Sequence, residues 1–122
     1  MSVTGVLCRL ARGTALCLED QKPAIAKGFF AQPKDVYPQE MFFEAALEDF
    51  VIHLEDLENV TFGGNRIGCC GNSSEGPHLF CARNHAVGWE RADCWMPHFA
   101  FFRAGCVRLV EVAASPPEVG RE

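Results

Sequence analysis

Residues 98–112 read HFAFFRAGCVRLVEV, and this stretch decides the fold that we expect. Its two halves, His98–Phe102 and Cys106–Val112, are rich in aromatic and β-branched residues, which favour strands. They flank Arg103-Ala104-Gly105, a three-residue connection of the kind that joins the strands of a β-hairpin. The sequence therefore predicts an antiparallel hairpin at this point of the chain.

Upstream, residues 38–50 (PQEMFFEAALEDF) have the spacing of a helix. Phe43, Leu47 and Phe50 recur on one helical face, which would turn toward the core. Pro38 suits the first turn of a helix, where its missing N–H costs nothing. The spacing predicts one α-helix over Pro38–Phe50.

Shorter segments around this helix favour strands because apolar residues alternate or cluster in them. The expected strands are Thr14–Glu19, Ala24–Ala31 and Val51–Leu57. The glycine- and serine-rich run Gly68–Pro77 is expected to be a loop. The fold class that follows is α+β, with a small antiparallel β-sheet, one α-helix and an irregular cysteine-rich segment.

Length and composition favour one domain. The chain has 122 residues, of which 48% are hydrophobic, and this is enough to bury a core. We expect a single globular domain over residues 1–114. The end of the chain, residues 115–122 (SPPEVGRE), is polar with two prolines and is predicted to be a disordered tail.

Charge excludes one class of partner. The net charge is −5, and eight acidic residues but no Lys or Arg lie between Asp35 and Glu58. Such a segment would repel a polyanion, so nucleic acid is not expected as a partner. It would be solvated surface or a contact for a basic partner.

The compartment is inferred from the N-terminus and the cysteines. Arg9 and Arg12 interrupt the apolar run that a signal peptide needs, and no stretch is long enough for a membrane span. We therefore expect a cytoplasmic protein that does not enter the membrane. The seven cysteines are then free thiols or metal ligands rather than disulfides.

Cysteine and histidine gather in the second half of the chain. The pairs His78-x2-Cys81 and Cys94-x3-His98 are separated by twelve residues, which resembles the layout of tetrahedral zinc sites. Thiolate and imidazole are also the ligands that zinc prefers. Zinc is thus the one cofactor expected, and its candidate ligands are His78, Cys81, Cys94 and His98, with Cys69 and Cys70 as alternates.

Other readings of this region remain open. The same cysteines could be small buried hydrophobes, with the histidines as loop or strand-end residues. A thiol- or zinc-dependent enzyme using residues 69–98 is the alternative: Cys70 would be a reactive thiol, or Glu90 a base beside a metal-bound water. Cys70 or Cys94 could also form a nucleophilic arrangement with a nearby histidine and acid, the candidates being His78, His85, His98 and Asp93.

Part of this region resembles a family of small uncharacterised bacterial proteins. The resemblance lies within residues 68–95, on Gly68-Cys69-Cys70-Gly71, Gly76-Pro77, Cys81, Gly88 and Asp93-Cys94-Trp95. The family has Cys-x-Cys-Gly where this chain has Cys81-Ala82-Arg83-Asn84, so a second thiol is absent here. The resemblance implies no activity.

The function that the sequence favours is a small intracellular binding or interaction domain, with zinc as a structural ion. Its partner would be a protein or a small molecule. Exposed edges of a small sheet also favour a homodimer.

Overall fold

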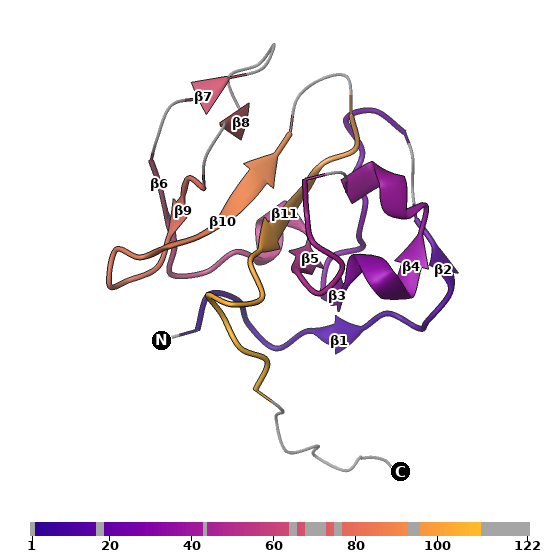
Figure 1. Ribbon diagram of the computed structural model, residues 1–122, viewed down its shortest axis with the longest axis horizontal. Helices are drawn as coiled ribbons and strands as arrows, with labels where there is room; N and C mark the ends of the chain where they lie inside the picture. Colours follow the sequence, from indigo (N-terminus) through magenta and orange to yellow (C-terminus); the bar gives the residue numbers. More distant parts are fainter. Residues whose placement is uncertain are drawn as a thin grey trace.

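A computed structural model describes residues 2–16, 19–42, 44–63, 66–67, 73–74, 77–92 and 96–110. Most of its regular structure belongs to one seven-stranded mixed sheet (Figure 1). Neighbouring strands are antiparallel except for the parallel pair of β1 and β3. In spatial order the strands are β1 (Cys8–Arg9), β3 (Phe29–Ala31), β5 (Phe50–Ile52), β11 (Phe99–Phe102), β10 (Ala86–Arg91), β9 (Leu79–Phe80) and β6 (Thr61–Phe62).

Strand β11 forms the centre of the molecule. All four of its residues are buried, because apolar side chains cover both faces of the sheet there. One cluster of buried residues contains Phe99 and Phe101, and the other contains Ala100 and Phe102. A strand buried on both faces reads as a continuous apolar run, as residues 99–102 do.

The two clusters draw on different parts of the chain. The first comprises Ala24, Ile25, Ala31, Val36, Phe42, Val51, Met96, Phe99 and Phe101. The second comprises Phe30, Ile52, Leu79, Val87, Ala100 and Phe102. Val3 and Leu7 also pack against the second cluster, together with Leu57 and Val60.

The N-terminal segment links the two ends of the sheet. Thr4 pairs with Leu57, and the Glu58 N–H donates to the Val3 carbonyl over 2.7 Å. The same segment continues into β1 at one edge, whereas Glu58 lies just before β6 at the other. The sheet therefore curves around the second cluster.

A smaller layer covers the first cluster, at the right of Figure 1. It contains a two-stranded parallel sheet of β2 (Thr14–Ala15) and β4 (Val36–Tyr37). Two 3-10 helices flank β4, namely η1 (Pro33–Asp35) and η2 (Gln39–Phe42). Val36 and Phe42 from this layer are buried in the first cluster.

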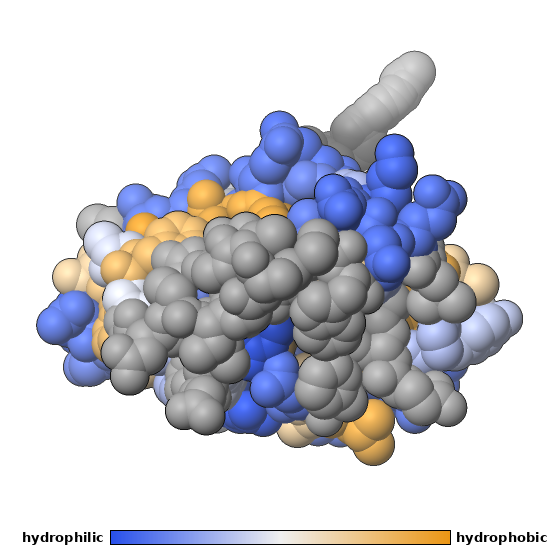
Figure 2. Space-filling view, turned by 90° about the horizontal axis from the view of Figure 1, so that it is seen from above, coloured by the Kyte–Doolittle hydropathy of each residue, from blue (hydrophilic) through white to orange (hydrophobic). Residues whose placement is uncertain are grey.

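Three further short elements complete the described structure. The 3-10 helix η3 (Leu54–Asp56) follows β5. Strands β7 (Arg66–Ile67) and β8 (Ser73–Ser74) pair with each other at the upper left of Figure 1. Seen from above, the described surface is largely hydrophilic, with one elongated hydrophobic area toward the left of the view (Figure 2).

The expected α+β class is wrong, because the described residues contain 3-10 helices and strands but no α-helix. The helix predicted over Pro38–Phe50 is replaced by η2, a loop and the start of β5. Phe50 pairs with Phe102 of β11, so strand pairing at the sheet centre overrides the helical spacing. Asp49 ends the loop: its Oδ2 accepts the Ala46 N–H at 2.9 Å.

The predicted hairpin over residues 98–112 is also wrong. Its first half forms β11, but β11 pairs with β10 and β5 instead of the following residues. Residues 106–110 form no strand. The hairpin that the sequence analysis missed joins β9 to β10 through Cys81–His85, where Asn84 has a φ of 66°. Asparagine tolerates this left-handed conformation better than most residues.

The other strand predictions hold only in part. β2 covers the first two residues of Thr14–Glu19, and β3 covers the last three of Ala24–Ala31. The segment Val51–Leu57 leaves the sheet after Ile52, where the His53 Nδ1 accepts the Glu55 N–H at 2.9 Å and caps η3. The predicted tail over residues 115–122 lies outside the described residues.

Within the described ranges, none of the helical segments has the length and apolar character that a membrane span requires.

Candidate functional site

His78, the first of the predicted zinc ligands, is fully buried just before β9. Its Nε2 accepts the backbone N–H of Glu90 at 3.1 Å. The lone pair of Nε2 is therefore already used in a hydrogen bond, so a metal ion would have to bind Nδ1. Glu90, the predicted base, places Oε1 3.8 Å from the same Nε2 on the sheet face of the second cluster.

Cys81, the second predicted ligand, opens the turn between β9 and β10. Its N–H donates to the His85 carbonyl at 2.9 Å, and its carbonyl accepts the Asn84 N–H at 2.8 Å. A backbone hydrogen bond from His85 lowers the pKa of the Cys81 thiol, and the backbone and charge of Arg83 add to this effect while burial opposes it. Cys81 is thus a partly exposed thiol with enhanced thiolate character.

His98 lies beside the chain segment around Pro23. Its N–H donates to the Lys22 carbonyl and its carbonyl accepts the Ala24 N–H, at 2.8 and 2.9 Å. These bonds fix the entry to β11. They involve only the backbone of His98 and do not place its side chain near Cys81.

In the part of the chain that the structure describes, no three His, Cys, Asp or Glu side chains form a group that could hold a metal ion. Three of the six candidate ligands, namely Cys69, Cys70 and Cys94, lie outside the described residues, as does Asp93. The zinc site built from His78, Cys81, Cys94 and His98 therefore stays a prediction.

Elemental analysis of the purified protein tests this prediction. A site of this kind would hold one zinc per chain, and zinc would protect Cys81 and Cys94 from alkylation until a chelator is added. A metal-free protein whose thiols react identically with and without chelator would contradict it.

A column of charged and aromatic side chains runs along the other face of the sheet. The Arg103 guanidinium lies 4.7 Å from the centre of the Trp89 ring, which stacks on Phe101 at 4.9 Å. Arg103 also donates to Oδ2 of the fully buried Asp49 at 2.8 Å, and the Ala104 N–H donates to Oδ1 at 2.9 Å. These contacts of Asp49 tie the start of β5 to the end of β11.

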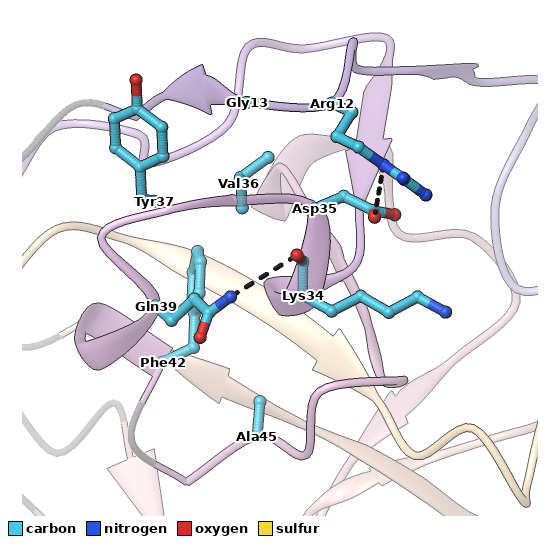
Figure 3. Close-up of a pocket in the computed structure, with 9 residues that line it drawn as sticks. All are labelled: Arg12, Gly13, Lys34, Asp35, Val36, Tyr37, Gln39, Phe42 and Ala45. Atoms are coloured by element: carbon cyan, nitrogen blue, oxygen red, sulfur yellow. Dashed lines mark hydrogen bonds and ion pairs between the residues drawn. The ribbon is translucent and has the colours of Figure 1, made fainter.

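A hollow in the described surface lies in the small layer, beside β4 (Figure 3). Its volume is about 620 Å³. The apolar part of its wall comes from Val36, Phe42 and Ala45, and the Tyr37 ring stands at one end of it in Figure 3. Its lining residues are Arg12, Gly13, Lys34, Asp35, Val36, Tyr37, Gln39, Phe42 and Ala45.

Charged side chains lie at the opposite end of the hollow from Tyr37 (Figure 3). Asp35 is mostly buried and accepts two ion pairs, from Arg12 Nε at 3.4 Å and from Arg9 Nη1 at 3.6 Å. Lys34 pairs with both carboxylate oxygens of Glu48, at 2.9 and 3.0 Å. The hollow is therefore apolar at one end and charged at the other.

A proline and several hydrogen bonds hold the segments around this hollow in place. Pro33 begins η1, where a proline is favoured, and the Val36 N–H closes it on the Pro33 carbonyl. The Gly13 N–H donates to the Asp35 carbonyl, which brings the turn before β2 against η1. Gln39 donates from Nε2 to the Lys34 carbonyl at 3.4 Å and so connects η2 to η1.

This hollow was not predicted from the sequence. The helix expected over Pro38–Phe50 would place Phe42 outside the predicted apolar face. The available signal was the run Val36-Tyr37 between prolines, a short apolar pair of the kind that forms an edge strand. The sequence does not indicate that Arg12 lies beside Val36 and Tyr37, because the segments that pair as β2 and β4 are far apart in the chain.

Comparisons with protein-family models, curated proteins and solved structures give no match for this chain, so the resemblance carried by residues 68–95 stays a prediction.

Proposed function

We propose that this protein is a small binding domain that holds a segment of a partner protein in the hollow beside β4. The observation that carries the proposal is the hollow itself. Its wall combines apolar side chains with a few polar groups, as the walls of binding sites do.

The rim of the hollow favours a protein segment over a small molecule. Tyr37 is 56% exposed and the Arg12 side chain 86% exposed, so the hollow is bordered by side chains that reach into solvent. Small-molecule sites usually enclose most of their ligand. An open hollow suits one anchoring side chain of a longer segment, which makes further contacts along the rim.

Exposed apolar residues next to the hollow support the same proposal. The Leu47 carbonyl accepts the Lys34 N–H at 3.2 Å, and the Leu47 side chain is 54% exposed. Leu47 and Tyr37 thus add apolar surface on the segments that bound the hollow. Aromatic residues such as tyrosine are enriched at protein interfaces.

Fluorescence anisotropy with a labelled, capped nine-residue peptide tests this proposal. The peptide carries a central phenylalanine flanked by glutamines, so it has an apolar anchor and no charge. We expect it to bind, and we expect Tyr37→Ala to weaken its binding about fivefold or more, as for a truncated interface anchor.

Leu109→Ala is the matched control, because Leu109 is 53% exposed but does not line the hollow. It should leave the affinity unchanged. Absence of peptide binding, or equal losses in the two variants, would overturn the proposal.

A second candidate function rests on Cys81. Its lowered pKa favours thiolate, which is the nucleophilic and metal-binding form of cysteine. The thiol lies in the β9–β10 turn and does not line the hollow. The reactivity of the Cys81 thiol should therefore be unchanged in Tyr37→Ala. Cys81→Ser should abolish that reactivity and leave peptide binding unchanged.

A further inference from the structure

We infer that the partner segment is acidic on one side of its apolar anchor, an inference that rests on the proposed function of the hollow. The described charges at this end are three cations, Arg9, Arg12 and Lys34, against two carboxylates, Asp35 and Glu48. The difference is one positive charge. A local surplus of positive charge on a chain of net charge −5 favours a negatively charged partner at this place.

The surplus positive charge lies on Arg12. Its Nε pairs with Asp35, and the described structure places none of its terminal nitrogens in a hydrogen bond. Arg9, by contrast, also donates to Gln32 at 3.2 Å and lies 4.8 Å from the centre of the Phe30 ring. Arg12 therefore keeps the paired terminal N–H groups with which a guanidinium binds a carboxylate.

Two nearby acidic residues whose side chains the structure describes do not cancel this charge. Glu44 forms an ion pair with the buried Arg91, and Asp49 pairs with Arg103. Both carboxylates are thus neutralised by cations of the central strands and their ends. Among the described side chains, those that face the charged end of the hollow remain net positive.

The positions of these charged side chains also determine the direction in which the partner segment would lie in the hollow. In Figure 3 the Arg12 and Lys34 side chains extend on the side away from Tyr37. An apolar anchor in the middle of the hollow would place the residues on one flank toward Arg12 and those on the other flank toward Tyr37. The acidic residues should therefore matter on one flank only.

Four capped nine-residue peptides test this inference: a central phenylalanine flanked by glutamines, by glutamates on the N-terminal side, by glutamates on the C-terminal side, or by lysines. We expect one glutamate peptide to bind about fivefold more tightly than the lysine peptide at low salt, and added salt to reduce the difference. The other glutamate peptide should resemble the glutamine peptide.

Arg12→Gln should abolish the preference for glutamate over lysine, with a larger loss of affinity for the glutamate peptide than for the glutamine peptide. Arg108→Gln is the matched control, because Arg108 is exposed and does not line the hollow. It should leave the preference intact.

The outcomes separate the inference from the proposed function. Equal affinities for the glutamate and lysine peptides would overturn the inference but leave the binding function standing. Failure of the glutamine peptide to bind would overturn the function itself. Free N-acetylphenylalanine that binds as tightly as the best peptide would show a small-anion site and would contradict a partner segment.

Discussion

Gly88 shows at the residue scale why the central strands need a particular amino acid. A Cβ at this position would overlap the Phe101 carbonyl oxygen and lie 3.0 Å from Cδ1 of Phe102. Gly88 pairs directly with Phe102, so there is no room to move without breaking the β10–β11 ladder. Glycine in a strand often marks such a close approach of backbone.

Gly88→Ala is therefore expected to destabilise the protein by about 1–3 kcal/mol through overpacking. Gly105→Ala is the control, because a Cβ there meets nothing within 4 Å. It should change the free energy of unfolding by less than about 0.5 kcal/mol. Urea denaturation of both variants measures the difference, and equal stabilities would contradict the packing described for β10.

Cys81 leads to a prediction about pH. Because hydrogen bonding lowers the thiol pKa, the thiolate is present at lower pH in the folded protein than in the unfolded chain. Alkylation of Cys81, followed at the peptide level by mass spectrometry, should therefore reach half its maximal rate at a lower pH under native conditions than in urea. Coinciding pH profiles would contradict the hydrogen bonds of the turn.

The charge pattern also has to be read residue by residue. The sequence suggests a continuous acidic surface over residues 35–58, but several of these carboxylates pair with cations from distant segments. Asp35 binds Arg9 and Arg12, whereas Glu55 binds Lys27 at 3.5 Å. Such partners cannot be found in a local window of sequence, so the segment is less negative than its composition indicates.

At the scale of elements, the loop before β5 depends on one buried carboxylate. Asp49 accepts hydrogen bonds from the Ala46 and Ala104 backbones and from Arg103. It thereby joins the end of the η2 loop to the end of β11. The same contacts explain why a helix cannot continue through residues 46–50.

Asp49→Asn should destabilise the protein by about 1–3 kcal/mol, because it turns a buried amide NH2 toward a donor, whereas the 37% exposed Arg103 can be solvated. Glu48→Gln is the neighbouring control: Glu48 is 63% exposed, and its pair with Lys34 should contribute at most about 1 kcal/mol. Thermal unfolding of the two variants compares them. Equal losses would show that Asp49 is not an anchor.

The strand predicted at His98–Phe102 contains all of β11, because its apolar and aromatic residues favour a strand. For β5 the prediction was right at Val51 and Ile52 but assigned Phe50 to a helix, since a short apolar run can belong to a helix or a strand and only pairing with β11 and β3 decides between them. Strand β10 was not predicted, because Gly88, Glu90 and Arg91 interrupt its apolar residues. Glu90 and Arg91 have partners elsewhere in the fold, namely His78 and Glu44.

At the scale of the whole molecule, one mixed sheet organises two apolar clusters, and the hollow lies in a separate small layer. Tyr37, Arg12 and Phe42 come from three segments that the fold brings together around the hollow. The sequence pointed to the cysteines and histidines because their residue types are distinctive. A hollow made of common residues has no such signal, so the candidate site could not be predicted from the sequence.

Binding in the hollow is tested most sharply by mapping backbone amide NMR shifts during titration with the glutamate peptide that binds more tightly. We expect the largest shifts at Gly13, Val36, Tyr37 and Ala45, which line the hollow. Shifts that instead concentrate on residues 77–92, or an unchanged spectrum at saturating peptide, would contradict it.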